Sequence, residues 1–256
     1  MDGGASVTSV PREHPGVGPA IESGRLGVWA GLSSDPIADA VHQAICEGRL
    51  PAGTRLGEEE LCRIFGVSRT LVRQALQRLG FAGLVTLRPN RSAFVASPTV
   101  DETAAAYAAR RLIEADVMAE ATRHCSANDI RRLRDHLRLQ AKAFAGGQRS
   151  VLLRLLGEFH LIIATIGGNP ILGDFVRQLV PRTTLSLALF ERRDLPSCAL
   201  DEHRLLIDLM AKGDIRAAAQ AMRRHLSSDF RRLAMKQMAE PTVNLAEALR
   251  VSPSRS

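Results

Sequence analysis

The sequence is poor in the residues that cross-link a small protein or anchor one in a membrane. Only 4% of its 256 residues are aromatic. The four cysteines (Cys46, Cys62, Cys125 and Cys198) lie far apart and form no CxxC pair, so we expect reduced thiols instead of disulfides or a cysteine-ligated metal. No run reaches about 18 apolar residues, and no basic segment leads into an apolar one near residue 1. We therefore predict a cytoplasmic protein with no membrane partner.

The chain also lacks the short motifs of common enzymes. It contains no GxSxG, HExxH, Walker loop or GxGxxG, and its GVSRT segment departs from the nucleophile-elbow pattern at the last position. We therefore predict that it is not an enzyme. The composition is globular, with 45% hydrophobic and 24% charged residues, and its many Ala, Leu and Arg residues favour a mainly α-helical fold. The net charge of +7 is a weak indication of an anionic partner.

Composition and periodicity divide the chain into four segments. Residues 1–33 are rich in Gly and Pro and predict a flexible tail. Residues 34–98 form a compact N-terminal domain, residues 99–240 form an all-helical domain, and residues 241–256 form a C-terminal tail with at most one loose helical turn. The helices expected in the second domain span about 101–125, 127–146, 149–166, 169–180, 182–193, 198–212 and 214–239.

The N-terminal domain predicts three helices and a hairpin. Helical patterns cover 35–48, 57–66 and 69–80, and two short strands are expected within 83–97 around a Pro-Asn-Arg turn. Gly66 suits the tight turn between the second and third helices. This order is the plan of a winged helix-turn-helix. The residues expected on the inner face of the third helix are Leu71, Val72, Ala75, Leu76 and Leu79.

Candidate DNA-contacting residues gather at the start of that third helix. A recognition helix enters the major groove with its N-terminal residues on the base edges. That end carries Ser68, Arg69, Thr70 and Arg73, and arginine can read guanine bidentately or pair with phosphate. Arg88 and Arg91 on the hairpin are expected to flank the minor groove or the DNA backbone. The alternative to DNA contact is that the arginines of this helix form a solvent-exposed basic face.

The stretch LPAGTRLGEEELCRIFGVSRTLVRQALQRLGFAGLV resembles the DNA-binding domain of GntR-type bacterial transcription regulators. The resemblance rests on the GVSRT core, the VRxAL helix and the GLV entry to the wing. It implies that the arginines and hydroxyls named above contact an inverted-repeat operator in double-stranded DNA. Glu59 departs from the pattern, because some members carry a DNA-contacting Arg there, and Ser92 stands at the wing tip where Gly is usual.

The second domain resembles the FCD ligand-binding domain of the same regulators. The segments ARRLIEADVMAEAT, GEFHLIIATIGGNP and DEHRLLIDLMAKGDIRAAAQAMRRHL carry this resemblance. It implies an antiparallel α-helical bundle that dimerises and binds a small effector in its middle, often on a metal ion. Arg110 and Glu114 match the family's RxxxE. Arg110 can bind a carboxylate effector, or it can form an i,i+4 ion pair with Glu114.

Three histidines share the apolar faces of three different expected helices. They are His160, His203 and His225, and neutral imidazole is the commonest metal ligand. Zinc is favoured by ligand type, with nickel, manganese or iron as alternatives. The family's fourth ligand is an Asp four residues before the first His, where this chain has Leu156. Glu158 lies on another face and is a poor substitute. A three-His metal site, a metal-free effector pocket and simple packing all remain open.

These residues predict a ligand-responsive transcriptional regulator. We expect a repressor that binds its operator as a homodimer and responds to a small metabolite, an organic acid or similar compound, held by Arg110 and the three histidines. One alternative is a metal sensor in which the ion itself is the effector. A more distant one is a metal-dependent enzyme that uses the same histidines.

Overall fold

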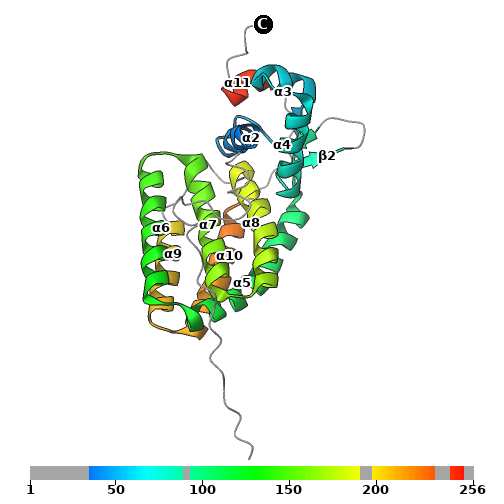
Figure 1. Ribbon diagram of the computed structural model, residues 1–256. Coiled ribbons are helices and arrows are strands. Elements are labelled where there is room, and N and C mark those ends of the chain that lie inside the picture. The colour runs from blue at the N-terminus through cyan, green and yellow to red at the C-terminus, as the bar shows by residue number, and fades with distance from the viewer. Residues whose placement is uncertain (1–34, 89–92, 191–197, 234–242, 251–256) are drawn as a thin grey trace, which may run out of the picture.

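The computed structural model describes residues 35–88, 93–190, 198–233 and 243–250. The described residues form a small head and a larger bundle of helices, joined at the start of the long helix α5 (Figure 1). The N-terminal segment 1–33, with its predicted tail, lies outside the described residues.

The head begins with three helices that form a helix-turn-helix core. They are α2 (Pro36–Cys46), α3 (Glu58–Phe65) and α4 (Arg69–Phe81). Asp35 caps α2 by accepting from the backbone of Ile37 and Ala38, at 3.0 and 3.2 Å. Gly66 ends α3 with a φ of +65°, a left-handed conformation that glycine adopts without strain. The predicted helix-turn-helix is confirmed.

A three-stranded antiparallel sheet completes the head. The predicted hairpin is formed by β2 (Val85–Leu87) and β3 (Ala93–Val95), while the turn between them lies outside the described residues. A third strand, β1 (Arg55–Leu56), pairs with the other edge of β3. We did not predict β1, because a strand of two residues has no periodicity to detect. The sheet is the wing of a winged helix-turn-helix.

One residue expected in the core of the head is exposed. Val72, Ala75, Leu76 and Leu79 are buried as predicted, but the Leu71 side chain is 49% exposed. Leu71 and Val72 are adjacent, so they point about 100° apart around the helix. The narrow contact of α4 with the small head covers only one of them, and the prediction for Leu71 was wrong.

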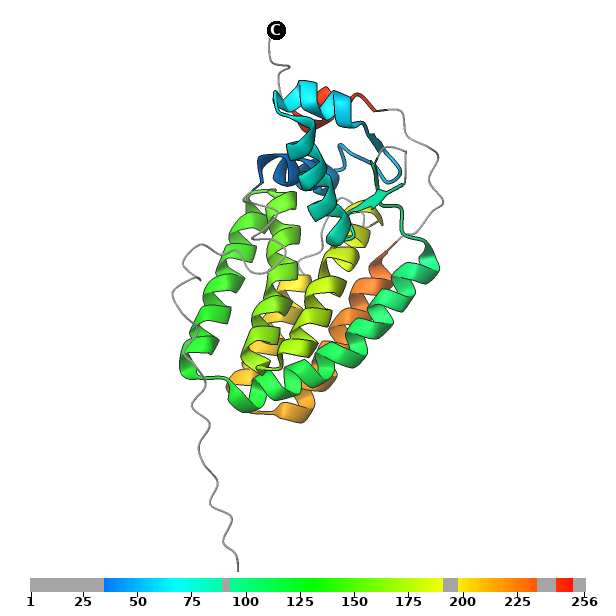
Figure 2. The same ribbon diagram turned by 45° about the vertical axis from the view of Figure 1, so that its right-hand side comes forward.

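The second domain is a bundle of helices. Its members are α5 (Val100–His124), α6 (Ala127–Ala145), α7 (Arg149–Gly167), α8 (Pro170–Phe190), α9 (Cys198–Ala211) and α10 (Ile215–Arg232). Capping boxes start α5 at Thr99 and α6 at Ser126, where each hydroxyl accepts from a backbone N–H three residues on. In Figure 2, α5 and α10 lie side by side along one edge of the bundle.

Helix α8 corrects the prediction of two helices at 169–180 and 182–193. Pro181 lies inside one continuous helix. A proline there removes one hydrogen bond and ordinarily kinks or ends a helix. Here Val180, Pro181 and most of the following turn are buried, and α8 packs against α5 and α7, so tertiary packing keeps the helix whole. Helix α10 ends at Arg232, before the predicted end at 239.

Helix α7 is the apolar centre of the bundle. In the described part of the chain it is the one helix long and apolar enough to cross a membrane, and 61% of its most apolar 18-residue window is buried inside the protein. It packs against α5, α6 and α8. This burial is what a core helix requires, and it places His160 in the middle of the domain.

The described part of the C-terminal segment returns to the head. The short helix α11 (Leu245–Leu249) packs against α2 and α3, and both figures show it beside α3 (Figures 1 and 2). The side chains of Leu245, Ala248 and Leu249 are buried, so this turn belongs to the core of the head and not to a loose tail.

Candidate functional site

The first candidate surface lies on the head, at the start of α4. Ser68, Arg69, Thr70 and Arg73 are all exposed there. The Ser68 hydroxyl makes no capping hydrogen bond, which leaves it available to a ligand. These side chains stand at the end of the helix that a helix-turn-helix presents to the major groove.

Both arginines at this surface are paired with acids of α3. Arg69 Nη2 lies 2.8 Å from Glu59 Oε1, and Arg73 Nε lies 2.9 Å from Glu58 Oε2. A groove of about 700 Å³ runs beside them, lined also by Arg55 and Arg88. Positive charge therefore predominates along the groove, although two carboxylates reduce it.

The wing contributes Arg88 to the same surface. Its guanidinium carbon stacks 4.6 Å from the centre of the Phe94 ring, which holds the side chain near β3. Arg91, the other wing residue that we predicted to contact DNA, lies outside the described residues. The DNA contacts as a set remain a prediction.

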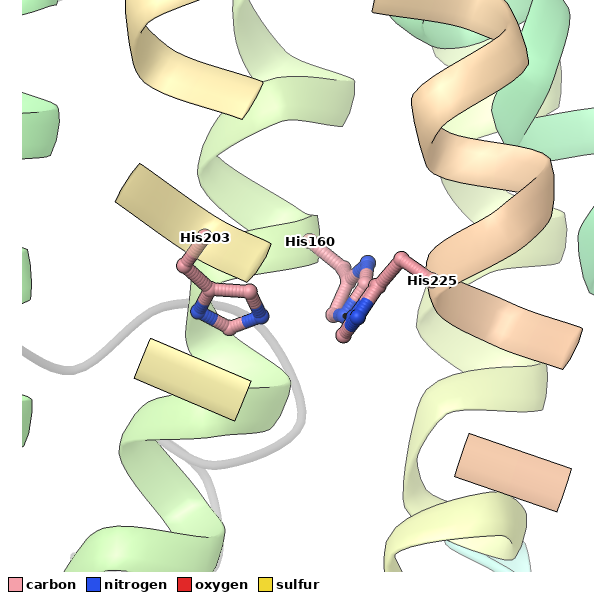
Figure 3. Close-up of side chains that lie close together, drawn as sticks. All are labelled: His160, His203 and His225. Atoms are coloured by element: carbon pink, nitrogen blue, oxygen red, sulfur yellow. Dashed lines mark hydrogen bonds between the residues drawn. The ribbon is translucent and has the colours of Figure 1, made fainter. Parts of the chain in front are cut away.

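The second candidate site is a histidine cluster inside the bundle. His160 on α7, His203 on α9 and His225 on α10 point toward a common centre (Figure 3). All three are at least 96% buried, and one ring nitrogen from each lies within 4.8 Å of the others. The Nε2 atoms of His160 and His225 are 3.4 Å apart. The convergence predicted from three separate apolar faces is therefore present.

Each histidine has an oxygen partner at its Nδ1 atom. His160 Nδ1 lies 2.6 Å from Glu114 Oε2, and His225 Nδ1 lies 2.7 Å from Glu202 Oε2. These oxygens face the outer side of each ring. At His225 the Glu202 acceptor favours a ring proton on Nδ1, as in the carboxylate–histidine pairs that support metal ligands. His160 Nδ1 lies within ion-pair distance of Glu114 but without hydrogen-bond geometry.

The third partner, Gln140 on α6, fixes the tautomer of His203. Gln140 Nε2 donates to the Leu155 carbonyl at 3.2 Å, so its Oε1 faces His203 and accepts from Nδ1 at 2.9 Å. The amide of Gln140 is fully buried and has no freedom to reverse without losing both bonds. His203 is consequently held with an unprotonated Nε2. The stacked Phe159 ring, 3.8 Å away between centroids, fixes its orientation.

Arg110 and Glu114 form a buried ion pair beside the cluster. Arg110 donates from Nε and Nη2 to the two Glu114 oxygens and from Nη1 to the Thr183 hydroxyl. Burial raises the pKa of Glu114, but Arg110 and His160 outweigh it and lower that pKa to about 2. The fold therefore contains the Arg110–Glu114 ion pair, which is one of the two roles that the RxxxE motif suggested. The guanidinium lines the cavity with these partners already in place.

Burial and neighbouring charges set the protonation of the cluster. Burial lowers the pKa of His160 to about 4, although Glu114 acts in the opposite direction. Burial also lowers the pKa of His203 well below its usual value. For His225, burial is outweighed by Asp229 and Glu202, which raise the pKa. Two of the three rings are thus neutral at pH 7, as a metal requires, and a proton on His225 would compete with the metal.

The space at the centre of the cluster is small. The cavity measures about 20 Å³, and one water-sized occupant needs roughly 10–15 Å³. The wall is polar at the histidines and apolar where Phe144, Leu152 and Leu200 line it. An ion fits this volume, whereas an organic acid requires the wall to move.

Sequence reasoning missed the groups that orient the histidines. Gln140 and Glu202 lie on α6 and α9, and only the packing of the helices brings them to His203 and His225. Asp229 also lines the cavity. It lies four residues after His225, a spacing that places two side chains on one helix face and could have revealed it.

Comparison with known families covers both domains. Residues 33–95 match the family described as bacterial regulatory proteins, gntR family, and residues 105–228 match the FCD domain. The gap between the two matches runs from the end of β3 into the first residues of α5, where the head meets the bundle.

Individual relatives are transcriptional regulators. The chain is 26% identical over 189 residues to the HTH-type transcriptional repressor RspR of Escherichia coli strain K12, which covers 73% of this chain and 81% of RspR. It is 26% identical over 195 residues to a probable D-xylose utilization operon transcriptional repressor of Paenarthrobacter nicotinovorans, over 75% and 84% of the two chains. The structure of E. coli McbR/YncC shares the fold, with a TM-score of 0.65, 21% identity and coverage of 77% and 94%.

Proposed function

Because this chain belongs to the GntR family of bacterial transcriptional regulators and carries an FCD domain, we propose that it is a repressor whose operator binding is controlled at the three-histidine site. It acts in the cytoplasm as a homodimer on an inverted-repeat operator. A divalent metal, with zinc favoured, is held by His160, His203 and His225. The observation that carries the proposal is the convergence of one ring nitrogen from each of the three histidines, whose Nδ1 atoms all have an oxygen neighbour.

The exposed start of α4 supports the DNA-binding part of the proposal. Arg69 and Arg73 are one turn apart on the exposed face of α4, so both can reach the same groove. Arginine is the side chain best suited to guanine, and Ser68 and Thr70 can bond phosphate or a base edge. Arg88 and Arg91 extend the contact to the backbone beside the groove.

Exposed apolar side chains on the bundle support a dimer. Leu112 on α5 is 72% exposed, and Ile171 and Phe175 on α8 are 63% and 48% exposed. Helices α5 and α8 pack against each other, so these residues lie on one pair of neighbouring helices. We propose that a second copy covers them and presents a second α4 helix to the other half of an inverted repeat, whose adjacent major grooves lie about 34 Å apart.

The chemistry of the donors decides what the site can hold. Three imidazoles suit zinc once His225 has lost its proton, and they leave a fourth position for a carboxylate or water, with a fifth ligand also possible at zinc. An organic acid that binds there also meets Arg110 and the apolar wall. When bound, the metal supplies a Lewis-acidic anchor for that carboxylate. Within the chain, Glu114, Gln140 and Glu202 hold the three imidazole rings in place.

A metal sensor is the second candidate function. The specific observation in its favour is the cavity of about 20 Å³, which accepts an ion without any movement of its wall. In that case the metal alone changes operator affinity. An effector can shift an equilibrium only by its differential affinity for the two states, typically 1–3 kcal/mol.

Operator binding measured with and without metal and carboxylates tests the proposal. Operator DNA is first selected from random sequence with the full chain. We expect Arg69→Ala and Arg73→Ala each to weaken binding by about 1–3 kcal/mol, while Arg138→Ala, an exposed bundle residue, serves as the control. Zinc alone should change affinity if the metal is the effector, and a carboxylate should be needed if it is not. Unchanged affinity in both arginine variants would contradict the proposed DNA surface.

A further inference from the structure

The position that carries a ligating carboxylate in FCD domains is apolar in this chain. Leu156 stands one turn before His160 on α7 and packs with Leu152, Leu155 and Leu200 in a small hydrophobic cluster. This side of the site therefore offers no oxygen. Glu158 is buried on another face, with its carboxylate 3.7 Å from Arg154.

Asp229 brings a carboxylate to the cluster from the opposite helix. It lies on α10 one turn after His225, is 5% exposed, and lines the same cavity as the three histidines. Arg232 holds its Oδ1 atom through an ion pair. The other oxygen, Oδ2, lies 3.6 Å from His225 Nε2, the nitrogen that faces the centre of the cluster.

The two separations around His225 Nε2 match those of a metal's ligands. In a tetrahedral zinc site with bonds of about 2.0–2.1 Å, neighbouring ligand atoms are about 3.3–3.4 Å apart. His225 Nε2 is 3.4 Å from His160 Nε2 and 3.6 Å from Asp229 Oδ2. Asp229 Oδ2 is within ion-pair distance of His225 Nε2, and His225 Nε2 is within hydrogen-bond distance of His160 Nε2, so a bound ion would replace these direct contacts at similar separations.

The other two acidic residues near the cluster contact the Nδ1 atoms of the histidines. Glu114 Oε2 lies 2.6 Å from His160 Nδ1, and Glu202 bonds His225 Nδ1, although Glu202 also groups with His225 and Asp229 within 4.8 Å. Among the described residues that line the cavity, Asp229 is the one acid. The ion pair with Arg232 leaves Oδ2 as its available oxygen and orients the carboxylate, as hydrogen bonds orient ligating carboxylates in metal sites.

From this geometry we propose that Asp229 is the carboxylate ligand of the metal site and replaces the one lost at Leu156. The inference rests on the proposed metal site. It predicts a site of three histidines and one aspartate in which two ligands, His225 and Asp229, come from consecutive turns of α10. In the structure Asp229 lies within 4.8 Å of ligand atoms of His225 and Glu202 but does not join the three-histidine group, so its carboxylate has to move toward the cluster when the metal binds. Metal binding then ties the C-terminal half of α10 to α7 and α9.

Zinc affinity of single variants tests the assignment. The dissociation constant is measured on the full chain by competition with a chromogenic chelator, and the d–d absorption of the cobalt-substituted protein reports the ligand set. We expect Asp229→Asn to weaken zinc binding by at least about tenfold and to change the cobalt spectrum. Asp116→Asn, an exposed acid on α5, should do neither. Circular dichroism checks that each variant is folded.

A second variant restores the carboxylate at the other position. In the Asp229→Asn background, Leu156→Asp should recover zinc affinity, because residue 156 lies on the same face as His160. If Asp229→Asn binds zinc and cobalt as wild type does while His203→Ala loses zinc, the Asp229 assignment is wrong and the three-histidine site stands. If His203→Ala also keeps wild-type affinity, the proposed metal site itself fails.

Discussion

Arg69 on α4 and Glu59 on α3 form an ion pair, with 2.8 Å between Nη2 and Oε1, that joins the two helices of the DNA-reading head. Both side chains are more than half exposed, so the pair is free to exchange with DNA. Glu59 stands where some GntR regulators have an arginine. The carboxylate therefore neutralises Arg69 at the surface that we propose to face the phosphates.

Replacement of Glu59 should strengthen binding to DNA of any sequence. We expect Glu59→Gln to bind random-sequence DNA severalfold more tightly at low salt, because Arg69 is released and a negative charge is removed. The slope of log affinity against log salt should steepen by about one counterion. Fluorescence anisotropy over a salt series measures both quantities. Glu120→Gln, far along α5, is the control, and an unchanged slope in Glu59→Gln would contradict this role.

Loss of the Gln140 amide should weaken the metal site while the fold remains. Gln140→Met keeps the volume of this fully buried side chain but removes the acceptor for His203 Nδ1. Partners of this kind typically contribute about 10–100-fold to metal affinity. Zinc competition measures the change, with exposed Arg138→Ala as a reference. A dissociation constant within twofold of wild type would show that Gln140 does not orient His203.

Truncation of a residue in α11 should destabilise the protein. The Leu249 side chain is 5% exposed in the core shared with α2. We expect Leu249→Ala to lower the free energy of unfolding by about 2–4 kcal/mol, the range for a buried leucine. Leu205→Ala, on a side chain 47% exposed, should change it by under about 0.5 kcal/mol. Urea unfolding followed by circular dichroism compares them, and equal values would mean that α11 does not pack on the head.

Stability should fall with pH partly through His42 in the head. Burial, with help from Arg154, lowers the pKa of His42 from 6.5 to about 4. The unfolded chain therefore binds a proton at this histidine below about pH 6.5, whereas the folded chain does not bind it until about pH 4. The stability that the neutral ring contributes is present above pH 6.5 and is lost as the pH falls toward 4.

The size of this pH dependence follows from the difference between the pKa of His42 in the folded and unfolded chain. Between pH 6.5 and pH 5 it amounts to about 2 kcal/mol. In urea unfolding, the free energy of unfolding of wild type should fall between pH 7 and pH 5 by about 2 kcal/mol more than that of His42→Gln. Exposed His124→Gln is the matched control. The same pH dependence in His42→Gln and wild type would contradict the assignment.

Local sequence patterns were sufficient for most of the fold. Amphipathic periodicity located the helices of the head and bundle, and it placed the three histidines on inward faces because a helix fixes which side chains share a face. It failed at Leu71, where the width of the buried stripe depends on the partner surface. It also failed at Pro181, where burial on both sides overrides a local helix breaker.

The partners of the histidines could not be predicted from sequence periodicity. Gln140 meets His203 across 63 residues, and Glu114 meets His160 across 46. These contacts depend on the axial registration of one helix against another, which side-chain periodicity along a single helix does not encode. The ion pairs of Arg69 and Arg73 with α3 have the same origin. Asp229 is the exception, since its i+4 spacing from His225 is visible in the sequence.

Metal stoichiometry tests the central claim most directly. Tag-free wild type and His203→Ala are dialysed against the same low-micromolar zinc, and the bound metal per protomer is measured by elemental mass spectrometry. The account predicts about one equivalent in wild type and almost none in His203→Ala. Equal zinc in the two proteins, or none in wild type, would contradict a metal site built on His160, His203 and His225.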